Sequence, residues 1–323
     1  MAEIINEEKY PFNIFKPREI EFNGGSANLF LARFNSLYDL YNYLKSNPKV
    51  NEKVFQDLRS RTNGFSFAGK PYNEALEDLV KPIDPGYNEF LDLQANFNNA
   101  TLGQTSKYKT IRTVAGGRIH TPSYCAGSPY CYTIEERVLR PKFIKVFINL
   151  VYPADNTKES ILNRAIIITN VVNALEKAGY SIDLETFAIT AENQFFNDLT
   201  EISEIVIQIK KHAEKLNMAN LYKVLCNVEF LRRVLFSVLE TMSFENPLWG
   251  SSYGRNLQKN KVSGILKLSS DDIYFGYPSE MNILGKNLVS DFESAIRMLD
   301  VDDKIDVDKT CEDFETQYKM IKR

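Results

Sequence analysis

The chain has 323 residues, enough for one large domain or two ordinary ones with a substantial core. Its 44% hydrophobic and 12% aromatic residues exclude an intrinsically disordered protein. The net charge of −3 excludes an overall basic field that would recruit nucleic acid, although a local basic groove stays compatible with it. Because no apolar run approaches the roughly 18 residues of a membrane helix and the first residues lack a signal-peptide pattern, we expect a cytoplasmic protein. Four cysteines in a chain of this length indicate free thiols, which fit that compartment.

Residues 1–106 are predicted to form a helical N-terminal region of short helices joined by turns. One helix is expected to begin at Ser36, because Ser36 and Asp39 have the spacing of a helix cap and apolar residues follow at helical spacing. Two more are expected from Tyr72 to Val80 and from Tyr87 to Phe97.

Residues 107–142 differ in composition from the N-terminal region and are predicted to be a β-rich segment around a cysteine loop. Strands are expected from Tyr108 to Val114 and from Tyr132 to Leu139, where β-branched and aromatic residues are frequent. A glycine and a proline within the loop Cys125–Cys131 indicate a tightly specified backbone path.

The segment from Phe143 to Thr190 carries the clearest pattern in the chain. Lys145–Tyr152 is typical of a buried strand, and apolar residues from Ile161 to Leu175 recur at the spacing of a long helix with one buried face. Gly179 marks the end of that helix, and a second strand begins near Ile182. Two strands joined by a helical crossover are predicted to form a parallel, right-handed βαβ unit.

Further elements follow this unit in an alternating order. They are a strand at Glu201–Lys210, a helix at Glu229–Glu240, an edge strand at Asp272–Tyr277 and a last helix at Ser290–Leu299. The alternation predicts an α/β fold with a three-layer, Rossmann-like core and a mainly parallel sheet over residues 143–299. Residues 300–323 are predicted to be a solvated, charged tail.

The stretch FINLVYPADNTKESILNRAIIITNVVNALEKAGYSIDLETFAIT resembles the first half of a von Willebrand A-type domain. The version in cobalt-chelatase subunits is the most similar, with a strand, an ion-binding loop, a long helix and a second strand in this order. Domains of this type bind a divalent ion through Asp-x-Ser-x-Ser after the first strand. The matching place here is Asn149–Pro153, which lacks that carboxylate and both hydroxyls. Since hard cations need oxygen ligands, the departure implies that the ion site is absent.

Several separated motifs in one order carry a second resemblance, over residues 35–280. They are FNSL from Phe34, FAGKP from Phe67, the pair Gly116-Gly117, YCAGSPYC from Tyr124, Asn163-Arg164-Ala165 with ALEKAGY from Ala174, and FLRRVLF from Phe230. With these motifs the chain resembles a family of tailed-phage proteins that has no established activity. Tyr132 stands where members of that family usually have Met. The resemblance implies a phage origin, with work in the host cytoplasm or in the virion.

His120, Cys125 and Cys131 are candidate zinc ligands, because thiolates and imidazole suit that ion. No fourth ligand lies nearby, and Cys226 would have to come from far along the chain. Cys131 as a nucleophile with His120 as its base is a further alternative. We favour the plainer interpretation, in which the cysteines are small buried side chains of a specified loop, and we predict no metal and no cofactor.

Five basic residues are candidates for binding phosphate or a partner's carboxylates: Arg164, Arg232, Arg233, Lys210 and Lys211. Arginine can bind such groups with two parallel hydrogen bonds, and lysine clusters can contact a nucleic-acid backbone. In the structural alternative, which we favour, one arginine of each pair makes an internal ion pair and the other is exposed, while the lysines lie on solvated faces. The aspartates of residues 300–308 fail the spacing of a calcium-binding EF loop.

We expect a non-enzymatic phage protein that acts by binding other proteins, because phosphate-loop and hydrolase motifs are missing and Tyr and Phe are abundant. Self-assembly into an oligomer, a role in the virion and capture of a host factor all fit this expectation. The alternative is a nucleic-acid-binding or nuclease-like protein that uses the Lys/Arg clusters and a zinc-bound cysteine loop. No membrane partner is expected.

Overall fold

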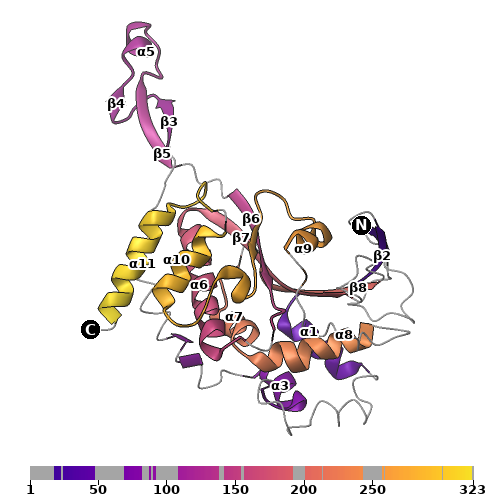
Figure 1. Ribbon diagram of the computed structural model, residues 1–323. Helices are drawn as coiled ribbons and strands as arrows, with labels where there is room; N and C mark the ends of the chain where they lie inside the picture. The colour runs from indigo at the N-terminus through magenta and orange to yellow at the C-terminus, as the bar shows by residue number, and fades with distance from the viewer. Residues whose placement is uncertain are drawn as a thin grey trace.

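The structure of the chain is a computed structural model (Figure 1). It describes residues 18–22, 25–47, 69–81, 87–88, 90–91, 108–137, 142–153, 156–191, 201–212, 214–242, 257, 259–299 and 301–321. The predicted helix at 87–97 lies largely outside these residues. Among the described helices, none combines the length and the apolar character that crossing a membrane requires.

A mixed six-stranded sheet forms the centre of an α/β body. Its strands run in the order β1-β2-β8-β7-β6-β9, with three parallel and two antiparallel neighbouring pairs. Their bounds are Arg18–Phe22 (β1), Gly25–Phe34 (β2), Lys142–Asn149 (β6), Tyr180–Ala191 (β7), Glu201–Lys210 (β8) and Ile273–Phe275 (β9).

The predicted unit at the centre of the sheet is confirmed. Strands β6 and β7 are parallel, with Val146 opposite Leu184, and helix α6 (Lys158–Lys177) connects them. The helix begins where the Thr157 side chain accepts a hydrogen bond from the Ser160 backbone N–H, which satisfies one of its free donors. It ends before Gly179, whose φ of +93° is a left-handed conformation that glycine adopts without strain.

Helix α6 is buried on more sides than its sequence pattern indicated. Thirteen of its 20 residues are buried, so a single apolar face is a wrong description. The reason is that helices α7 (Met218–Leu225) and α10 (Leu288–Arg297) pack on it, while its other side faces the sheet. A helix that is apolar around most of its circumference is typical of such a central position.

Strand β8 was expected in a mainly parallel sheet, but it runs antiparallel to β7. Nine residues, 192–200, separate the two strands. A parallel connection needs a dozen or more residues, so this segment is too short for a crossover helix. The shortness of this connection therefore favours the antiparallel direction of β8.

The sheet also includes two strands from the region predicted to be helical. Strand β2 pairs in parallel with β8, and β1 forms an antiparallel pair with β2. The helices predicted after Ser36 and at Tyr72 are confirmed as α1 (Leu37–Ser46) and α3 (Tyr72–Asp78). The correction is that the sheet of the body begins at residue 18. Ile20 of β1 packs against the smaller cluster, and β2 places apolar side chains on both faces of the sheet.

Helices cover the two faces of the sheet unequally. The larger hydrophobic cluster joins one face to α1, α3, α6, α7, α10 and the helical run of η2 (Phe230–Leu235, a π-helix) and α8 (Phe236–Met242). On the other face, the described helix is α9 (Lys259–Leu266), which contributes Val262 and Ile265 to a smaller cluster (Figure 1).

The C-terminal segment is packed against the body, contrary to the predicted solvated tail. Helix α11 (Val307–Ile321) lies beside α10, and the Phe314 ring stacks on Phe292 with ring centroids 3.8 Å apart. Val307 and Phe314 recur at helical spacing on the buried side of α11, which gives the charged segment an apolar face.

A second, three-stranded antiparallel sheet stands apart from the first. It has the order β3-β5-β4, with β3 (Tyr108–Thr113), β4 (Arg118–Ile119) and the central β5 (Tyr132–Arg137), and it carries the one-turn helix α5 (Thr121–Cys125). The strands predicted to begin at Tyr108 and Tyr132 are confirmed as β3 and β5. In Figure 1 it projects from the body with α5 at its tip. We call residues 108–137 the arm.

The contact of α11 with the body can be tested at Phe314. We expect Phe314→Ala to lower the free energy of unfolding by about 3 kcal/mol, because it removes a buried aromatic ring and leaves a cavity. Chemical denaturation followed by circular dichroism measures this change. Glu312→Ala, at an exposed position of the same helix, is the control and should change stability by less than about 0.5 kcal/mol. Equal stability of both variants would contradict the packed position of α11.

Candidate functional site

The carboxyl end of β6 is the place where an α/β sheet of this kind usually binds a ligand. From β6 the chain crosses over through α6 to β7 on one side, while β9 lies on the other side of β6. Ligands bind where neighbouring connections diverge in this way, next to the carboxyl ends of the strands. The side chains in the crevice at this end of β6 are therefore the first candidates for a binding site.

Side chains of the protein itself fill the crevice with a chain of hydrogen bonds. The Asn149 side-chain amide donates to the Tyr274 hydroxyl at 3.3 Å, and that hydroxyl donates to a Glu280 carboxylate oxygen at 3.1 Å. The Val151 backbone N–H donates to the Asn149 side-chain oxygen at 2.9 Å. Asn149 and Tyr274 are both buried, so these polar groups satisfy one another away from water.

A buried guanidinium group adjoins the same crevice. Arg164, on α6, donates through Nη2 to the backbone oxygen of Asn149 and is only 3% exposed. Burial lowers the pKa of Arg164 to about 10, while the nearby Tyr274 and Tyr152 act in the opposite direction. Its Nε has no hydrogen-bond partner, and Arg164 forms no ion pair with any described residue. A positive charge thus lies beside the end of β6, where it repels other cations.

Arg232 approaches the chain just after this point. It donates to the backbone oxygen of Tyr152 at 2.7 Å, and its guanidinium group lies over the rings of Tyr152 and Phe236. Arg233, the next residue, is buried on the same helical run. The structure therefore brings Arg164 and Arg232 to the same loop after β6, a proximity that their separation in the sequence did not reveal.

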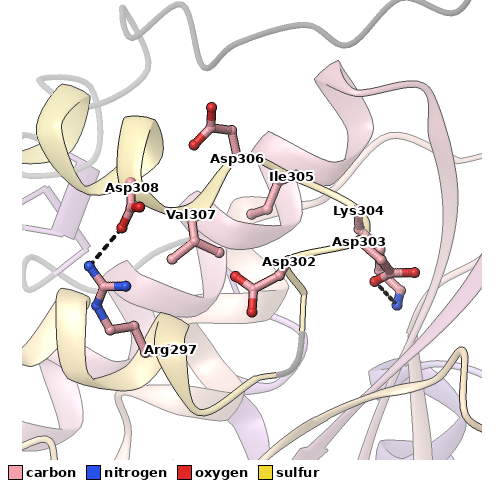
Figure 2. A pocket seen from close by; sticks show the side chains of 8 residues that line it. All are labelled: Arg297, Asp302, Asp303, Lys304, Ile305, Asp306, Val307 and Asp308. Atoms are coloured by element: carbon pink, nitrogen blue, oxygen red, sulfur yellow. Dashed lines mark hydrogen bonds and ion pairs between the residues drawn. The ribbon is translucent and has the colours of Figure 1, made fainter.

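An open pocket of about 390 Å³ lies where the chain passes from α10 to α11. Figure 2 shows its lining: Arg297, Asp302, Asp303, Lys304, Ile305, Asp306, Val307 and Asp308. Arg297 pairs with Asp308 at 2.8 Å, and Lys304 pairs with Asp303 at 2.8 Å. Asp302 makes no hydrogen bond or ion pair with the described residues, so this acidic pocket has a surplus of negative charge.

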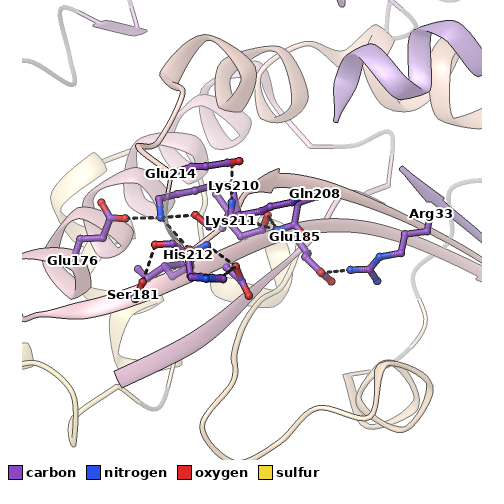
Figure 3. A network of polar contacts seen from close by, with 12 residues as sticks. Arg33, Glu176, Ser181, Glu185, Gln208, Lys210, Lys211, His212 and Glu214 are labelled. Carbon is purple, nitrogen blue, oxygen red and sulfur yellow. Dashed lines mark hydrogen bonds and ion pairs between the residues drawn. The ribbon is translucent and has the colours of Figure 1, made fainter. Parts of the chain in front are cut away.

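The two lysines that are candidates for binding phosphate, Lys210 and Lys211, have different environments (Figure 3). Lys210 is 1% exposed; its ammonium group pairs with Glu176 at 2.9 Å and donates to the backbone oxygen of Ile182 at 3.0 Å. Lys210 is therefore committed to internal contacts and does not present its charge to a phosphate. Lys211 is exposed at the end of β8, where its backbone N–H donates to Glu214.

Two buried carboxylates on the other face of the sheet were not found from the sequence. Glu185 on β7 pairs with Arg33 on β2 (Figure 3), while Glu204 on β8 has no hydrogen bond or ion pair with the described residues. Burial raises the pKa of Glu204 to about 7; the neighbouring Arg18 and Arg33 lower it and Glu185 raises it further. The alternation of buried and exposed positions gave no signal here, because β8 is buried on both faces.

The candidate zinc ligands are held in the arm by other contacts. His120 Nδ1 lies 2.7 Å from the Ser123 hydroxyl and caps α5, and the His120 backbone N–H donates to the Cys131 oxygen at 2.7 Å. Cys131 is buried, whereas Cys125 is exposed. Within the described ranges, no three His, Cys, Asp or Glu side chains come together in a way that suits a metal ion. Cys226 follows α7 in the body, and burial raises the pKa of its thiol.

The arm exposes an apolar face and a basic face. Ile111 lies directly opposite Ile134, and Ile119 opposite Tyr132, so these four side chains share one face of the sheet. Arg112 and Arg118 flank Thr133 on the other face. No described residue between 108 and 137 belongs to either hydrophobic cluster of the body. Several apolar residues of the arm are strongly exposed: Val114 62%, Ile119 55%, Tyr124 62% and Tyr130 57%.

A protein-family model matches residues 8–307 of the chain, and its description is "Domain of unknown function (DUF7192)". The chain belongs to this family. The match includes the sheet, the arm and the start of α11, so the family spans both parts of the fold. No curated protein and no solved structure matches the chain.

The hydrogen-bonded crevice can be tested at Tyr274. We expect Tyr274→Phe to lower the free energy of unfolding by about 1–2 kcal/mol, because the Asn149 amide and the Glu280 carboxylate both lose a partner. Tyr124→Phe removes the same atom from an exposed tyrosine and should have no measurable effect. Denaturant unfolding measures both variants, and an unchanged stability in Tyr274→Phe would show that the crevice is not closed by these bonds.

Glu204 predicts a pH dependence of stability. Its folded pKa of about 7 is above the ordinary value of 4.5, so the folded state retains a proton that the unfolded chain loses. Stability should fall as pH rises from about 4.5 to 7 and should remain lower above 7, by about 3 kcal/mol in total. Glu204→Gln should therefore match the wild type near pH 4.5 and be more stable at pH 8.

Unfolding by urea at several pH values measures this difference. Glu21→Gln is the control, because Glu21 is an exposed carboxylate on β1 of the same sheet. A wild type and a Glu204→Gln variant that differ by the same amount at pH 5 and pH 8 would refute the raised pKa.

Proposed function

We propose that the protein acts by binding other proteins and that the arm makes the contact. The observation that carries this proposal is the exposed apolar surface of a small sheet on which no described helix packs. A small antiparallel sheet gains stability when its hydrophobic face is covered, and exposed apolar patches rimmed by polar residues are typical of interaction sites. Exposed tyrosines are also frequent anchors of protein interfaces.

The filled crevice at β6 supports a binding role over a metal-dependent one. We propose that the body is a degenerate, von Willebrand A-like version of a Rossmann-like fold, and the β6–α6–β7 unit supports this assignment. In such a fold the ion would sit at the end of β6, where this chain has Asn149 and the buried charge of Arg164. A guanidinium group at this place opposes a divalent cation through charge repulsion.

The biological setting that we propose is a tailed phage, on the strength of the sequence motifs alone. Self-assembly, a role in the virion and capture of a host factor each use an exposed arm of this kind. Nucleic-acid binding keeps one observation in its favour, the basic face with Arg112 and Arg118 beside exposed tyrosines. Lys210 no longer supports nucleic-acid binding, because its ammonium group is paired with Glu176 inside the body.

The proposed function is tested by replacing the exposed tyrosines of the arm. We expect Tyr124→Ser combined with Tyr130→Ser to weaken capture of the partner about tenfold or more, because aromatic anchors carry much of the energy of an interface. The full chain is immobilised and exposed to extracts of host cells with and without phage, and the retained proteins are quantified by mass spectrometry.

Tyr38→Ser is the matched control, because Tyr38 is equally exposed, at 64%, but lies on α1 of the body. The melting temperature of each variant shows that the body is folded. If the arm variant retains the same proteins in the same amounts as the wild type and the control, the arm is not the contact surface.

A further inference from the structure

We propose that the arm of one molecule docks on the acidic pocket of a second copy of this chain, an inference that rests on the proposed function. The two surfaces are complementary in charge and in apolar character. The two surfaces lie on different parts of the molecule (Figures 1 and 2).

The arm has a net positive charge. Residues 108–137 contain one lysine, three arginines and two glutamates, a net charge of +2, although the chain as a whole has a charge of −3. Arg112 and Arg118 are exposed on opposite sides of Thr133, so their charges lie on one face of the sheet. Two arms would bring these charges together, and like charges across an interface are repulsive. The arm therefore favours an acidic partner surface over another arm.

The acidic pocket provides such a surface. Four aspartates contribute to its lining against Arg297 and Lys304, and both of these cations already have acidic partners. The Asp302 side chain points into the open space without a partner among the described residues (Figure 2). An arginine from another molecule would meet unpaired carboxylate charge there.

Two exposed apolar side chains, Met298 and Leu284, lie on the part of the chain that leads to the pocket. Met298 follows Arg297 directly and is 44% exposed, and its sulfur lies 3.5 Å from the Asn282 amide. Leu284, two residues beyond Asn282, is 62% exposed. The body thus exposes both carboxylates and apolar groups, as the arm exposes guanidinium groups together with Ile and Tyr side chains. Such a combination is typical of an interface with an apolar centre and a polar rim.

The position of the arm favours a contact between two molecules over a contact within one molecule. In Figure 1 the arm points away from the body, and its α5 tip is not placed over α10 and α11 of the same chain. A contact between two different surfaces is heterologous, so each molecule can bind one neighbour with its arm and another with its pocket. Such contacts form rings or open chains, in contrast to a closed symmetric dimer.

The experiment measures the mass of the purified full-length protein by sedimentation velocity over a range of concentrations and salt. We expect wild-type oligomers that grow with concentration and weaken with salt, because charges contribute to the contact. Arg112→Glu with Arg118→Glu reverses the arm's net charge, and Asp302→Lys reverses a charge in the pocket. Each variant alone should associate about tenfold or more weakly than the wild type.

Mixing the two variants gives the sharper test. One then supplies an intact pocket and the other an intact arm, so a one-to-one complex should form at concentrations at which each variant alone is mainly monomeric. Lys81→Glu and Asp271→Lys are matched controls at exposed positions of the body, and both should associate like the wild type. Melting temperatures confirm that all variants are folded.

Three results would overturn the inference. They are a wild type that is monomeric at every concentration, oligomers that neither substitution weakens, and a mixture that forms no complex. A monomer that still captures another protein through Tyr124 and Tyr130 leaves the proposed function standing and removes only this inference. A monomer that shifts duplex DNA in a gel, and loses the shift in the Arg112→Glu/Arg118→Glu variant, assigns the arm to nucleic acid and overturns both.

Discussion

The parallel pairing of β6 with β7 around helix α6 is the constraint on which the rest of the body depends. Because α6 is buried on most sides, it fixes the positions of the sheet beneath it and of α7 and α10 on its outer surface. From β7 the sheet extends through β8 to β2, and from β6 it extends to β9. A slip of one residue in the β6–β7 register would move Val146 and Leu184 from one face to the other, so the side-chain pattern permits only one pairing.

The buried charge of Arg164 has a physical consequence for the crevice at the end of this pair. A charged side chain out of water is unfavourable unless a polar group faces it, and the Asn149 backbone oxygen provides that group. The same oxygen lies at the carboxyl end of β6, where the chain leaves the sheet towards α6. Arg164 therefore satisfies this carbonyl from within the protein, and the Asn149–Tyr274–Glu280 hydrogen bonds close the remaining space.

The sequence predicted those parts of the fold whose contacts are local. The β6–α6–β7 unit needs only residues 142–191, and the arm strands pair within residues 108–137, so their patterns were sufficient. Strand β2 was missed because its partner β8 begins at residue 201, a contact that no local pattern reveals. The apolar face of α11 was hidden among aspartates, although Val307 and Phe314 have helical spacing.

The candidate site residues, too, could be predicted from the sequence only in part. The pattern identified Arg164, Arg232 and Lys210 as unusual, but their roles depend on the carbonyls and the carboxylate that they meet in the folded chain. Glu204 gave no signal, since a glutamate in a strand is ordinary until both faces of that strand are covered. Burial of a titratable group is a property of the assembled sheet, and a single strand does not contain it.

The arm poses a separate physical problem, because its outer strands β3 and β4 leave unpaired backbone groups at both edges of a small sheet. Such edges readily pair with other edges, and proteins commonly prevent this with charged side chains. Both edge strands contain basic residues, Lys109 and Arg112 on β3 and Arg118 on β4. These charges discourage two arms from pairing, while the apolar face remains available. In the contact that we propose, the charge that keeps two arms from pairing also meets the carboxylates of the acidic pocket.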